Sequence, residues 1–424
     1  QIKYIDSTLF LKNMENSFLS EFKKRDYFNQ CTNSEELEML MSKKKIRAYI
    51  GFDCTASSLH VGSLLQIMCL RMLQKYGHQP IVLLGGGTTR IGDPSGKDET
   101  RKILSEKEIE KNIKNIEKIF KTYLKTNNPK TKPIFVNNYK WLGKLNYIKF
   151  LRDIGKHFTI NKMLSFDSVK LRLERDQSLS YMEFNYMILQ AYDFLELNKT
   201  KNCLMQMGGS DQWGNIINGV ELVKRHSSKQ VYGLTTPLIT LASGTKMGKT
   251  ERGAVWLDEK LLSPYDYWQF WRNTDDRDVI KFIKMFTDIK LDKIEQIKNK
   301  NINELKILLA NEATTMLHGK SAASKAEETA KKTFGKGTIG DDLPSISIKK
   351  ENLKNGINII DLVILSNLLT SKSEVRRTIK NKGIKVNNNP IEDEKFIVSL
   401  ENFNNENILK LSHGKKNHVV IKIN

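Results

Sequence analysis

The sequence predicts an α/β protein with a parallel sheet in its first half, an α-helical domain after it, and a small α+β module at the end. Three observations support this order. Short apolar runs alternate with amphipathic stretches over the first half, helical periodicity alone continues from about 262 to 332, and a basic helix followed by a short strand occupies 358–391. Residues 335–345 have the composition of a linker.

The apolar pattern of the first half predicts four strands and three helices. Residues 63–77 place apolar side chains at helical spacing, and Gly77 is a good helix terminator. Because ligands of parallel sheets gather at the carboxyl ends of strands, we expect a site where the first strand meets its helix. The strands are expected at 46–52, 80–87, 132–138 and 203–209, and the helices at 63–77, 180–197 and 211–226.

The charge balance indicates a polyanionic partner. The 424 residues include 69 Lys and Arg against 48 Asp and Glu, a formal net charge of +21, which favours nucleic acid. The alternative is an AT-rich genome that places Lys and Asn on solvated faces. The four cysteines show no metal or disulfide spacing, and no apolar run is long enough to span a membrane. We therefore expect a cytoplasmic protein, with an organelle matrix left open.

The first candidate site follows the first predicted strand. His60 is followed two residues later by Gly62 at the start of a helix. A helix N-terminus favours negative charge, an imidazole can donate to a phosphate oxygen, and a glycine leaves room for a flat adenine ring. By itself the pair is a weak signal, because a histidine at a helix start is common.

A glycine-rich loop follows the second predicted strand. Gly85–Gly87 leads into GDPSGK (92–97), where Asp93 supplies a carboxylate and Lys97 and Arg101 supply cations. The segment suits a ligand site and equally suits an ordinary turn, since Asp-Pro-Ser-Gly is good turn chemistry.

A third candidate is the loop KMGKT (246–250). Lys246 and Lys249 are three residues apart with glycines on either side, which suits a mobile loop that closes over phosphates and stabilises the charge of a departing diphosphate. A single Lys-rich loop is usually a solvated surface, so its pairing with the earlier His-Gly motif is what gives it weight.

These two motifs together resemble the signatures of class I aminoacyl-tRNA synthetases. YIGFD (49–53), GDPSG (92–96), YMILQAYDF (186–194) and GGSDQWGN (208–215) are similar to the bacterial and organellar tyrosyl branch, in the same order over nearly the whole chain. The resemblance implies a Rossmann-like catalytic domain that activates tyrosine with ATP and transfers it to tRNA.

On the matching positions, the resemblance implies that Tyr49 and Asp193 hold the phenol of the substrate. Phenylalanine would leave this pair without a partner, and tyrosyl enzymes are the standard example of the strong rejection that results. The resemblance also puts Asp93, Tyr186 and Gln190 around the α-ammonium group. Tyr186, Gln190 and Asp193 are spaced four and three residues apart, so they share one helix face.

For ATP, the resemblance implies in-line attack of the tyrosine carboxylate on the α-phosphorus, without a protein nucleophile, so that positioning and charge stabilisation carry the rate. Mg²⁺ is expected with ATP, and no dedicated protein metal site. The implied ATP and adenylate residues are Gly51, Asp53, Thr55, His60, Gly62, Ser63, Gly209, Asp211 and Gln212. The implied cationic and loop residues are Lys97, Arg101, Lys246, Lys249 and Thr250.

Two positions depart from the family pattern. Ser63 replaces the second histidine of the signature, and Cys54 stands where many relatives carry proline. Because a serine can still donate one hydrogen bond, we expect a weaker contact with the ribose or phosphate rather than a lost function.

The last module resembles a small RNA-binding domain shared with a ribosomal small-subunit protein. A basic surface there could neutralise phosphates, the alternative being a merely solvated helix. The residues expected on this surface are Ser371, Lys372, Arg376, Arg377 and Lys380. The predicted domains are 1–240 (catalytic), 241–261 (mobile loop and connection), 262–334 (helical, anticodon-recognising), 335–350 (linker) and 351–424 (RNA-binding).

The partners implied are tRNA(Tyr), L-tyrosine, ATP and a second copy of the chain in a homodimer, with no membrane. A tryptophanyl enzyme is one alternative, but Tyr49 with Asp193 asks for a phenolic hydroxyl. A small-molecule nucleotidyltransferase would not explain the helical domain or the basic module. A non-catalytic RNA-binding relative is disfavoured by an intact set of candidate residues, namely His60, Asp93, Asp193, Lys246 and Lys249.

We predict that Ser63 serves ATP. The Ser63→Ala variant should need more ATP for adenylate formation, because it loses a hydrogen-bond donor at the nucleotide. The measurement is the ATP dependence of pyrophosphate exchange, and an unchanged dependence would defeat the hypothesis.

We also predict that the last module serves RNA only. Deletion of residues 350–424 should abolish tRNA charging, because the phosphate contacts are lost, while tyrosine-dependent pyrophosphate exchange survives. Equal loss of both activities would mean that the module is structural.

Overall fold

The computed structural model describes residues 17–94, 104–250, 253–335, 343–353, 356–404, 407–414 and 417–423. Their internal contacts divide the chain into two compact units. The first unit runs to Leu262 and includes Phe270–Leu317, and the second comprises Ser263–Gln269 and the chain from His318 onward.

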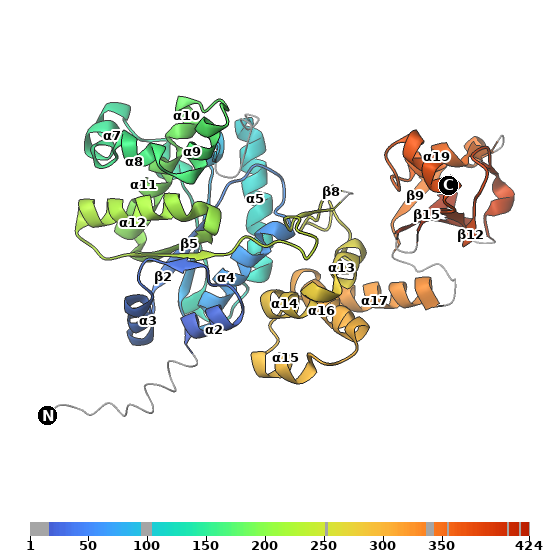
Figure 1. Ribbon diagram of the computed structural model, residues 1–424, viewed down its shortest axis with the longest axis horizontal. Helices are drawn as coiled ribbons and strands as arrows, with labels where there is room; N and C mark the ends of the chain where they lie inside the picture. The colour runs from blue at the N-terminus through green and yellow to red at the C-terminus, as the bar shows by residue number, and fades with distance from the viewer. Residues whose placement is uncertain are drawn as a thin grey trace. The chain divides into compact units, whose positions relative to one another are not determined.

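A six-stranded sheet forms the centre of the first unit (Figure 1). Its order is β1-β6-β5-β2-β3-β4, and every neighbouring pair is parallel except β1 with β6. The strands are β1 (Gln30–Cys31), β2 (Arg47–Phe52), β3 (Gln79–Leu84), β4 (Ile134–Asn137), β5 (Cys203–Gly209) and β6 (Tyr232–Thr236).

Helices cover both faces of this sheet. The connection from β2 to β3 through α4 (Leu64–Lys75) runs toward one edge, and the connection from β5 to β6 through α12 (Trp213–Ser227) runs toward the other. Because such crossovers are right-handed, their helices lie on opposite faces, as Figure 1 shows for α4 and α12. The strand order therefore reverses between β2 and β5, and the crevice at the carboxyl ends of these strands is where ligands of such sheets bind.

The remaining helices of the first half flank this framework. They are α2 (Phe18–Lys24), α3 (Ser34–Lys43), α5 (Glu106–Tyr123), α6 (Tyr139–Leu142), α7 (Tyr147–Asp153), α8 (Ile160–Leu164), α9 (Asp167–Glu174), α10 (Tyr181–Phe184) and α11 (Tyr186–Lys201), together with the 3-10 turns η1 (Val61–Ser63) and η2 (Thr88–Arg90). A short hairpin, β7 (Lys249–Thr250) with β8 (Gly253–Ala254), follows β6.

The fold class predicted from the sequence is confirmed, but the first half also contains two strands, β1 and β6, and several helices that the sequence analysis did not predict. The helix expected over 180–197 is two helices, α10 and α11, which meet at Asn185. A capping box of Ser180 and Glu183 starts α10, and Asn202 ends α11 in a left-handed conformation with φ 50°. The apolar periodicity continues across the break, which is why the sequence alone did not reveal it.

The core packs α11 against the sheet. Phe194 and Leu195 on α11 lie in one buried cluster with Tyr49 of β2 and Ile81 of β3. Burial of such side chains contributes about 1.5–3 kcal/mol each. This packing fixes α11 across the strands whose ends form the crevice.

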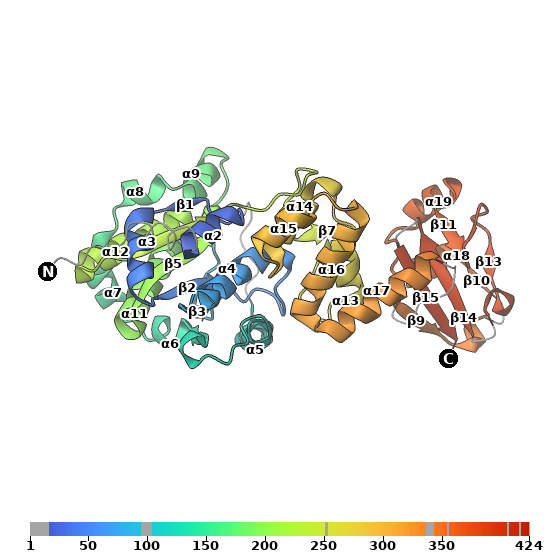
Figure 2. The ribbon, with the colours of Figure 1, turned by 90° about the horizontal axis from the view of Figure 1, so that it is seen from below.

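The later part of the chain is helical and then mixed, as predicted. The helices α14 (Val279–Phe286), α15 (Leu291–Ile297) and α16 (Ile302–His318) group together in Figure 2, and α13 (Pro264–Arg272) and α17 (Lys320–Gly335) complete the helical region. In the second unit, α18 (Ile359–Leu365) and α19 (Lys372–Lys380) pack on a five-stranded sheet.

The sheet of the second unit has the order β12-β11-β14-β15-β9. Its strands are β9 (Ser345–Ile348), β11 (Ile384–Val386), β12 (Asn389–Pro390), β14 (Ile408–His413) and β15 (Asn417–Ile423), beside a small pair of β10 (Ile357–Asn358) and β13 (Ile397–Val398). Because β9 pairs with β15, part of the stretch 335–350, expected as a linker, belongs to this sheet. The domain boundaries themselves stay predictions. In the described part of the chain, no helix is long and apolar enough to cross a membrane.

Candidate functional site

The site residues expected from the sequence converge at the carboxyl ends of β2, β3 and β5. Tyr49 lies on β2, Asp53 directly follows that strand, and Gly209 ends β5. Asp193 reaches the same crevice from α11. Adjacent parallel strands end at one edge of the sheet, so residues far apart in sequence come together here.

A buried carboxylate and a buried hydroxyl form the deepest part of the site. Asp193 is 2% exposed and accepts hydrogen bonds from Asn138 Nδ2 at 2.9 Å and from Trp141 Nε1 at 2.7 Å. The Tyr49 hydroxyl is buried and has no hydrogen-bond partner among the described residues. An orphaned buried hydroxyl costs about 1–3 kcal/mol, so this pair is held ready for a group from outside the chain.

Burial governs the electrostatics of this pair. Loss of hydration raises the pKa of Asp193 to about 7, against the opposing effect of its hydrogen bonds from Asn138 and Trp141. Burial, and then the charge of Asp193, raises the pKa of Tyr49 well above its ordinary value. Near neutral pH the carboxyl group is therefore poised between its two forms, and Tyr49 keeps its proton.

A second set of hydrogen bonds connects this pocket to the end of β2. The Thr88 hydroxyl accepts from Asn138 Nδ2 at 3.1 Å and donates to Asp53 Oδ1 at 2.7 Å. The other oxygen of Asp53 accepts from the Tyr186 hydroxyl at 3.0 Å. Asp53, expected on the ATP side, and Tyr186, expected on the amino acid side, are thus directly bonded.

The remaining amino-acid-side residues form an amide network. Gln212 Nε2 donates to Asp93 Oδ2 at 2.9 Å, and Gln190 Nε2 donates to Gln212 Oε1 at 3.3 Å. Asn215 Nδ2 contacts both amide oxygens, at 3.1 Å for Gln190 and 3.2 Å for Gln212. Beside this network, burial and then the charge of Asp93 raise the pKa of Asp211, while the charge of Lys246 opposes the rise.

The His-Gly motif and the lysine loop pack directly on each other. His60 Nδ1 accepts from the Gly62 backbone N–H at 3.0 Å, so the side chain caps the turn that starts α4. A Cβ atom at Gly62 would lie 2.6 Å from His60 Cε1 and 2.9 Å from the Met247 carbonyl oxygen, which is closer than real contacts allow. Val61 donates to Val255 at 2.9 Å, beyond the loop. Glycine at 62 therefore permits the close approach of the two motifs.

The other residues expected to bind ATP differ in how exposed they are, and some lie outside the described residues. Gly51 and Thr55 are exposed at the end of β2, and Lys246 is exposed on its loop. Ser63 is half-buried, and none of the described residues bonds its hydroxyl. Lys97 and Arg101 lie outside the described residues, and Lys249 and Thr250 are described by their backbone alone, as β7.

Cys54 is fully buried beside this segment. Its backbone N–H donates to Thr89 Oγ1 at 2.7 Å, and its carbonyl accepts from Asn112 Nδ2 at 2.9 Å. The first of these bonds needs a backbone N–H, which proline would lack. The cysteine at this position thus ties the loop after β2 to its neighbours.

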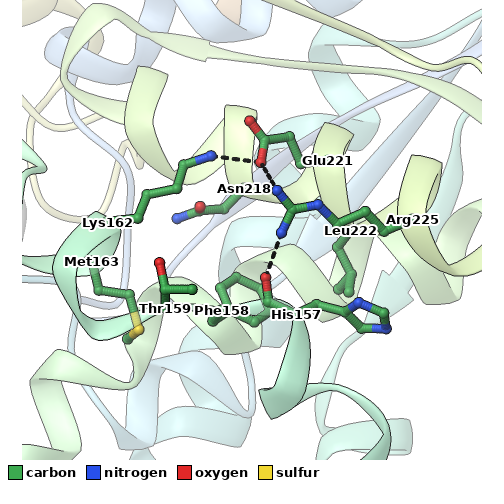
Figure 3. Close-up of a pocket in the computed structure, with 9 residues that line it drawn as sticks. All are labelled: His157, Phe158, Thr159, Lys162, Met163, Asn218, Glu221, Leu222 and Arg225. Atoms are coloured by element: carbon green, nitrogen blue, oxygen red, sulfur yellow. Dashed lines mark hydrogen bonds and ion pairs between the residues drawn. The ribbon is translucent and has the colours of Figure 1, made fainter.

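A separate small pocket lies beside α12 (Figure 3). It holds about 10 Å³, room for a single water molecule. Glu221, one of the lining residues, pairs with Lys162 at 2.5 Å and with Arg225 at 3.1 Å (Figure 3). The space is too small for a substrate. It is lined by His157, Phe158, Thr159, Lys162, Met163, Asn218, Glu221, Leu222 and Arg225.

In the second unit, α19 carries the residues expected to bind RNA. Val375 and Ile379 are buried in the core of the unit, while the basic side chains face outward. Two of them pair with carboxylates, Lys372 with Asp361 at 2.7 Å and Arg376 with Glu394 at 3.7 Å. The residues Ser371, Lys372, Arg376, Arg377 and Lys380 are all exposed.

Comparison with known proteins identifies the family. A model described as tRNA synthetases class I (W and Y) matches residues 41–335, and a model of the tyrosine–tRNA ligase SYY-like C-terminal domain matches 336–421. A tyrosine–tRNA ligase of Pelagibacter ubique is 70% identical over 408 residues, which cover 96% of this chain and 100% of the relative. The chain belongs to the tyrosine–tRNA ligase family.

Further members of the tyrosine–tRNA ligase family agree. The protein of Bartonella henselae is 53% identical over 411 residues, covering 96% of this chain and 99% of the relative. A C-terminally truncated mitochondrial tyrosyl-tRNA synthetase of Aspergillus nidulans has a similar structure, with a TM-score of 0.70, 29% identity and coverage of 77% of this chain and 97% of that chain. The fold is shared with an Archaeoglobus fulgidus tyrosyl-tRNA synthetase complexed with L-tyrosine, with a TM-score of 0.55, 18% identity and coverage of 73% and 99%. The resemblance seen in the motifs is confirmed.

Four residues of this tyrosine–tRNA ligase site were not expected from the sequence, and one of them is Asn215 of the amide network. Asn138, Trp141 and Thr88 supply the hydrogen bonds that hold Asp193 and Asp53. Asn138 and Trp141 follow directly after β4, and polar side chains after a strand at the carboxyl edge of a parallel sheet were the available signal.

We predict that the Tyr49 hydroxyl reads the substrate phenol. Tyr49→Phe should stabilise the free enzyme by about 1–3 kcal/mol, because the hydroxyl that is removed is buried without a partner. Discrimination between tyrosine and phenylalanine should fall about tenfold, the value of one hydrogen bond. The measurement is kcat/KM for pyrophosphate exchange with each amino acid, beside urea unfolding.

Tyr27→Phe is the matched control for this substitution. The Tyr27 hydroxyl is equally buried but donates to the Met285 carbonyl at 2.6 Å. Its removal should cost about 1–3 kcal/mol of stability and leave discrimination unchanged. The assignment of Tyr49 fails if both variants alter discrimination alike.

We predict that Asp193 makes stability depend on pH. Because its pKa is raised to about 7, the folded state holds this proton more firmly than the unfolded state does. The stabilisation is complete below the ordinary pKa and is lost as the pH rises through the folded value. Between about pH 5 and about pH 8, the wild type should lose about 2–4 kcal/mol relative to Asp193→Asn.

Urea unfolding of both proteins across this pH range measures the difference. Affinity for tyrosine should rise over the same range, because the ionised carboxylate is the better acceptor for a phenol. Parallel stability curves for the wild type and Asp193→Asn would show that Asp193 titrates normally.

Proposed function

We propose that this protein is a tyrosine–tRNA ligase, which joins L-tyrosine to ATP to form tyrosyl-adenylate and diphosphate and then transfers tyrosine to the 3′ end of tRNA(Tyr), releasing AMP. The observation that carries the proposal is the unpartnered hydroxyl of Tyr49 beside the buried carboxylate of Asp193. The phenolic hydroxyl of the substrate can donate a hydrogen bond to the Asp193 carboxylate and at the same time form one with the Tyr49 hydroxyl. Phenylalanine would leave the Tyr49 hydroxyl buried without a partner and would bring no donor to Asp193, so it is rejected without editing.

The amino acid is oriented from the other end by the amide network. Tyr186 bonds Asp53 directly after β2, and Gln212 joins Gln190 to Asp93. We assign Asp93, Gln190 and Tyr186 to the α-ammonium group. An anionic and amide-rich surface suits an ammonium group. The carboxylate of the substrate then points toward the nucleotide side.

On the nucleotide side, the packing of His60 and Gly62 against the lysine loop supports a cradle for the triphosphate. The tyrosine carboxylate attacks the α-phosphorus in line, and the diphosphate leaves. We assign stabilisation of the developing charge to cationic residues. These are Lys246, Lys249, Lys97 and Arg101, with Mg²⁺ accompanying ATP. The remaining nucleotide contacts are assigned to Gly51, Asp53, Thr55, Ser63, Gly209, Asp211, Gln212 and Thr250.

Transfer to RNA is assigned to the second unit. The outward face of α19 carries several cations and one helix-capping serine, Ser371. Such a face neutralises backbone phosphates and makes binding depend on salt. The match of residues 336–421 to the C-terminal domain model supports this assignment.

We also propose that the enzyme is a homodimer. Large apolar side chains are exposed over the neighbouring helices α7 to α10, and contiguous exposed apolar surface commonly marks an interface. These side chains are Tyr147, Ile148, Leu151, Ile160, Leu164, Leu173 and Tyr181, which are 39–70% exposed. The bacterial origin of the relatives supports a cytoplasmic location for the enzyme.

ATP–pyrophosphate exchange with each amino acid in turn tests the proposal. Exchange should depend on tyrosine and be weak with phenylalanine and tryptophan. Exchange that prefers tryptophan would identify the tryptophanyl alternative instead. Exchange with no amino acid would point to a non-catalytic RNA-binding relative.

A further inference from the structure

Asn138 and Trp141, the two donors that bond Asp193, belong to a segment that is too short to be stable by itself. Trp141 lies on α6, a helix of four residues, far shorter than a helix that is stable by itself. The Asn138 side chain makes no cap bond to this helix. It bonds Gly87, Thr88 and Asp193 instead. The position of both donors must therefore be fixed by contacts outside α6.

The glycine-rich loop after β3 is one such contact. The Gly87 N–H donates to Asn138 Oδ1 at 2.7 Å. A Cβ atom at Gly87 would lie 2.8 Å from Leu142, and one at Gly86 would lie 2.3 Å from the Asn137 amide. The two glycines thus permit a close approach between this loop and the segment 137–142.

Arg90, three residues after Gly87, makes a further contact with this segment. Its guanidinium carbon lies 3.8 Å from the centre of the Tyr139 ring, the first residue of α6. The same guanidinium donates to the Gly86 carbonyl and reaches Glu106 at 3.5 Å. The side chain is only 23% exposed, whereas Glu106 is 75% exposed, so the ring and the carbonyl are the contacts that matter.

We propose that Arg90 is a positioning residue for recognition of the tyrosine phenol, acting through Tyr139 on the donors Asn138 and Trp141. Stacking on Tyr139 and bonding Gly86 clamps α6 to the glycine loop. The clamp orients the two N–H groups that hold the Asp193 carboxylate in place. The inference deepens the proposed function and rests on it.

The strength of the contact between Arg90 and Tyr139 sets the expected effect of its removal on tyrosine recognition. A partly buried cation–π contact is worth a factor of about two to thirty in an equilibrium constant. Arg90→Met should therefore raise KM for tyrosine and lower the preference for tyrosine over phenylalanine by about two- to thirtyfold each. KM for ATP should change less than KM for tyrosine, because the donors bond Asp193 directly but reach Asp53, the assigned nucleotide contact, only through Thr88. Arg90→Lys keeps a cation over the ring and should restore part of the loss.

The matched control is Arg47→Met. Arg47 is another partly buried arginine that bonds a backbone carbonyl, that of Lys201 at 2.7 Å, and the Gln79 side chain at 2.8 Å. It lies at the opposite end of β2 from the crevice. Its removal should lower stability without changing the preference for tyrosine. A similar loss of preference in Arg47→Met would make the effect of Arg90 a general loss of stability and overturn the proposal.

The Tyr139→Leu variant tests whether Arg90 acts through Tyr139. It should reproduce the Arg90→Met defect, and the double variant should be no worse than either single variant, because both remove the same contact. Additive defects would mean that Arg90 does not act through Tyr139. Unchanged KM and unchanged preference in Arg90→Met, with tyrosine-dependent exchange in the wild type, would refute the inference while leaving the proposed function intact.

The indole N–H resonance of Trp141 gives a readout that needs no activity. In the wild type this N–H is bonded to Asp193 at 2.7 Å. In Arg90→Met it should move and exchange faster with solvent, and the Trp141→Phe variant assigns the signal. A resonance that does not change would refute the inference whatever the enzyme catalyses, whereas loss of tyrosine dependence in the wild type would count against the proposed function alone.

Discussion

The Asp193 carboxylate, buried and kept as a hydrogen-bond acceptor, is the constraint on which the rest of the site depends. Burying a charge is costly, and here the cost raises its pKa to about 7. Donors at 2.9 and 2.7 Å offset part of that cost, and the neighbouring Tyr49 hydroxyl is left without a partner in the described structure. A phenol that enters this pocket satisfies both groups, so the free enzyme carries an unfavourable arrangement that the right substrate relieves.

This constraint reaches the nucleotide side through Asp53. One oxygen of Asp53 is bonded through Thr88 to the phenol side, and the other is bonded to Tyr186 on α11. The two halves of the site are therefore one hydrogen-bonded network rather than two independent pockets. Since Asp53 directly follows β2, the network is anchored at the reversal of strand order, where a parallel sheet naturally opens a crevice. Catalysis by positioning alone needs such rigidity between amino acid and nucleotide.

Much of the fold could be predicted because its signals are local. Apolar runs located β2, β3, β4 and β5 to within a few residues, since a strand buried on both faces is apolar throughout. The break between α10 and α11 was missed because the same periodicity continues through Asn185. Tyr186, Gln190 and Asp193 were expected on one helix face, and all three lie on α11 with side chains in the crevice networks. Helical spacing is sufficient for that inference.

The sequence by itself determined the family, the strand that carries Tyr49 and is followed by Asp53, and the helix face that carries Asp193. These depend on motif order and on periods of two and 3.6 residues, which are properties of the chain alone. Only the tertiary structure decided what holds the carboxylate. Asn138 and Trp141 lie 55 and 52 residues from Asp193, and Arg90 contacts their segment from a different loop. Nothing local in the chain marks such partners, because they meet only when β4 pairs beside β3 and α11 packs across the sheet.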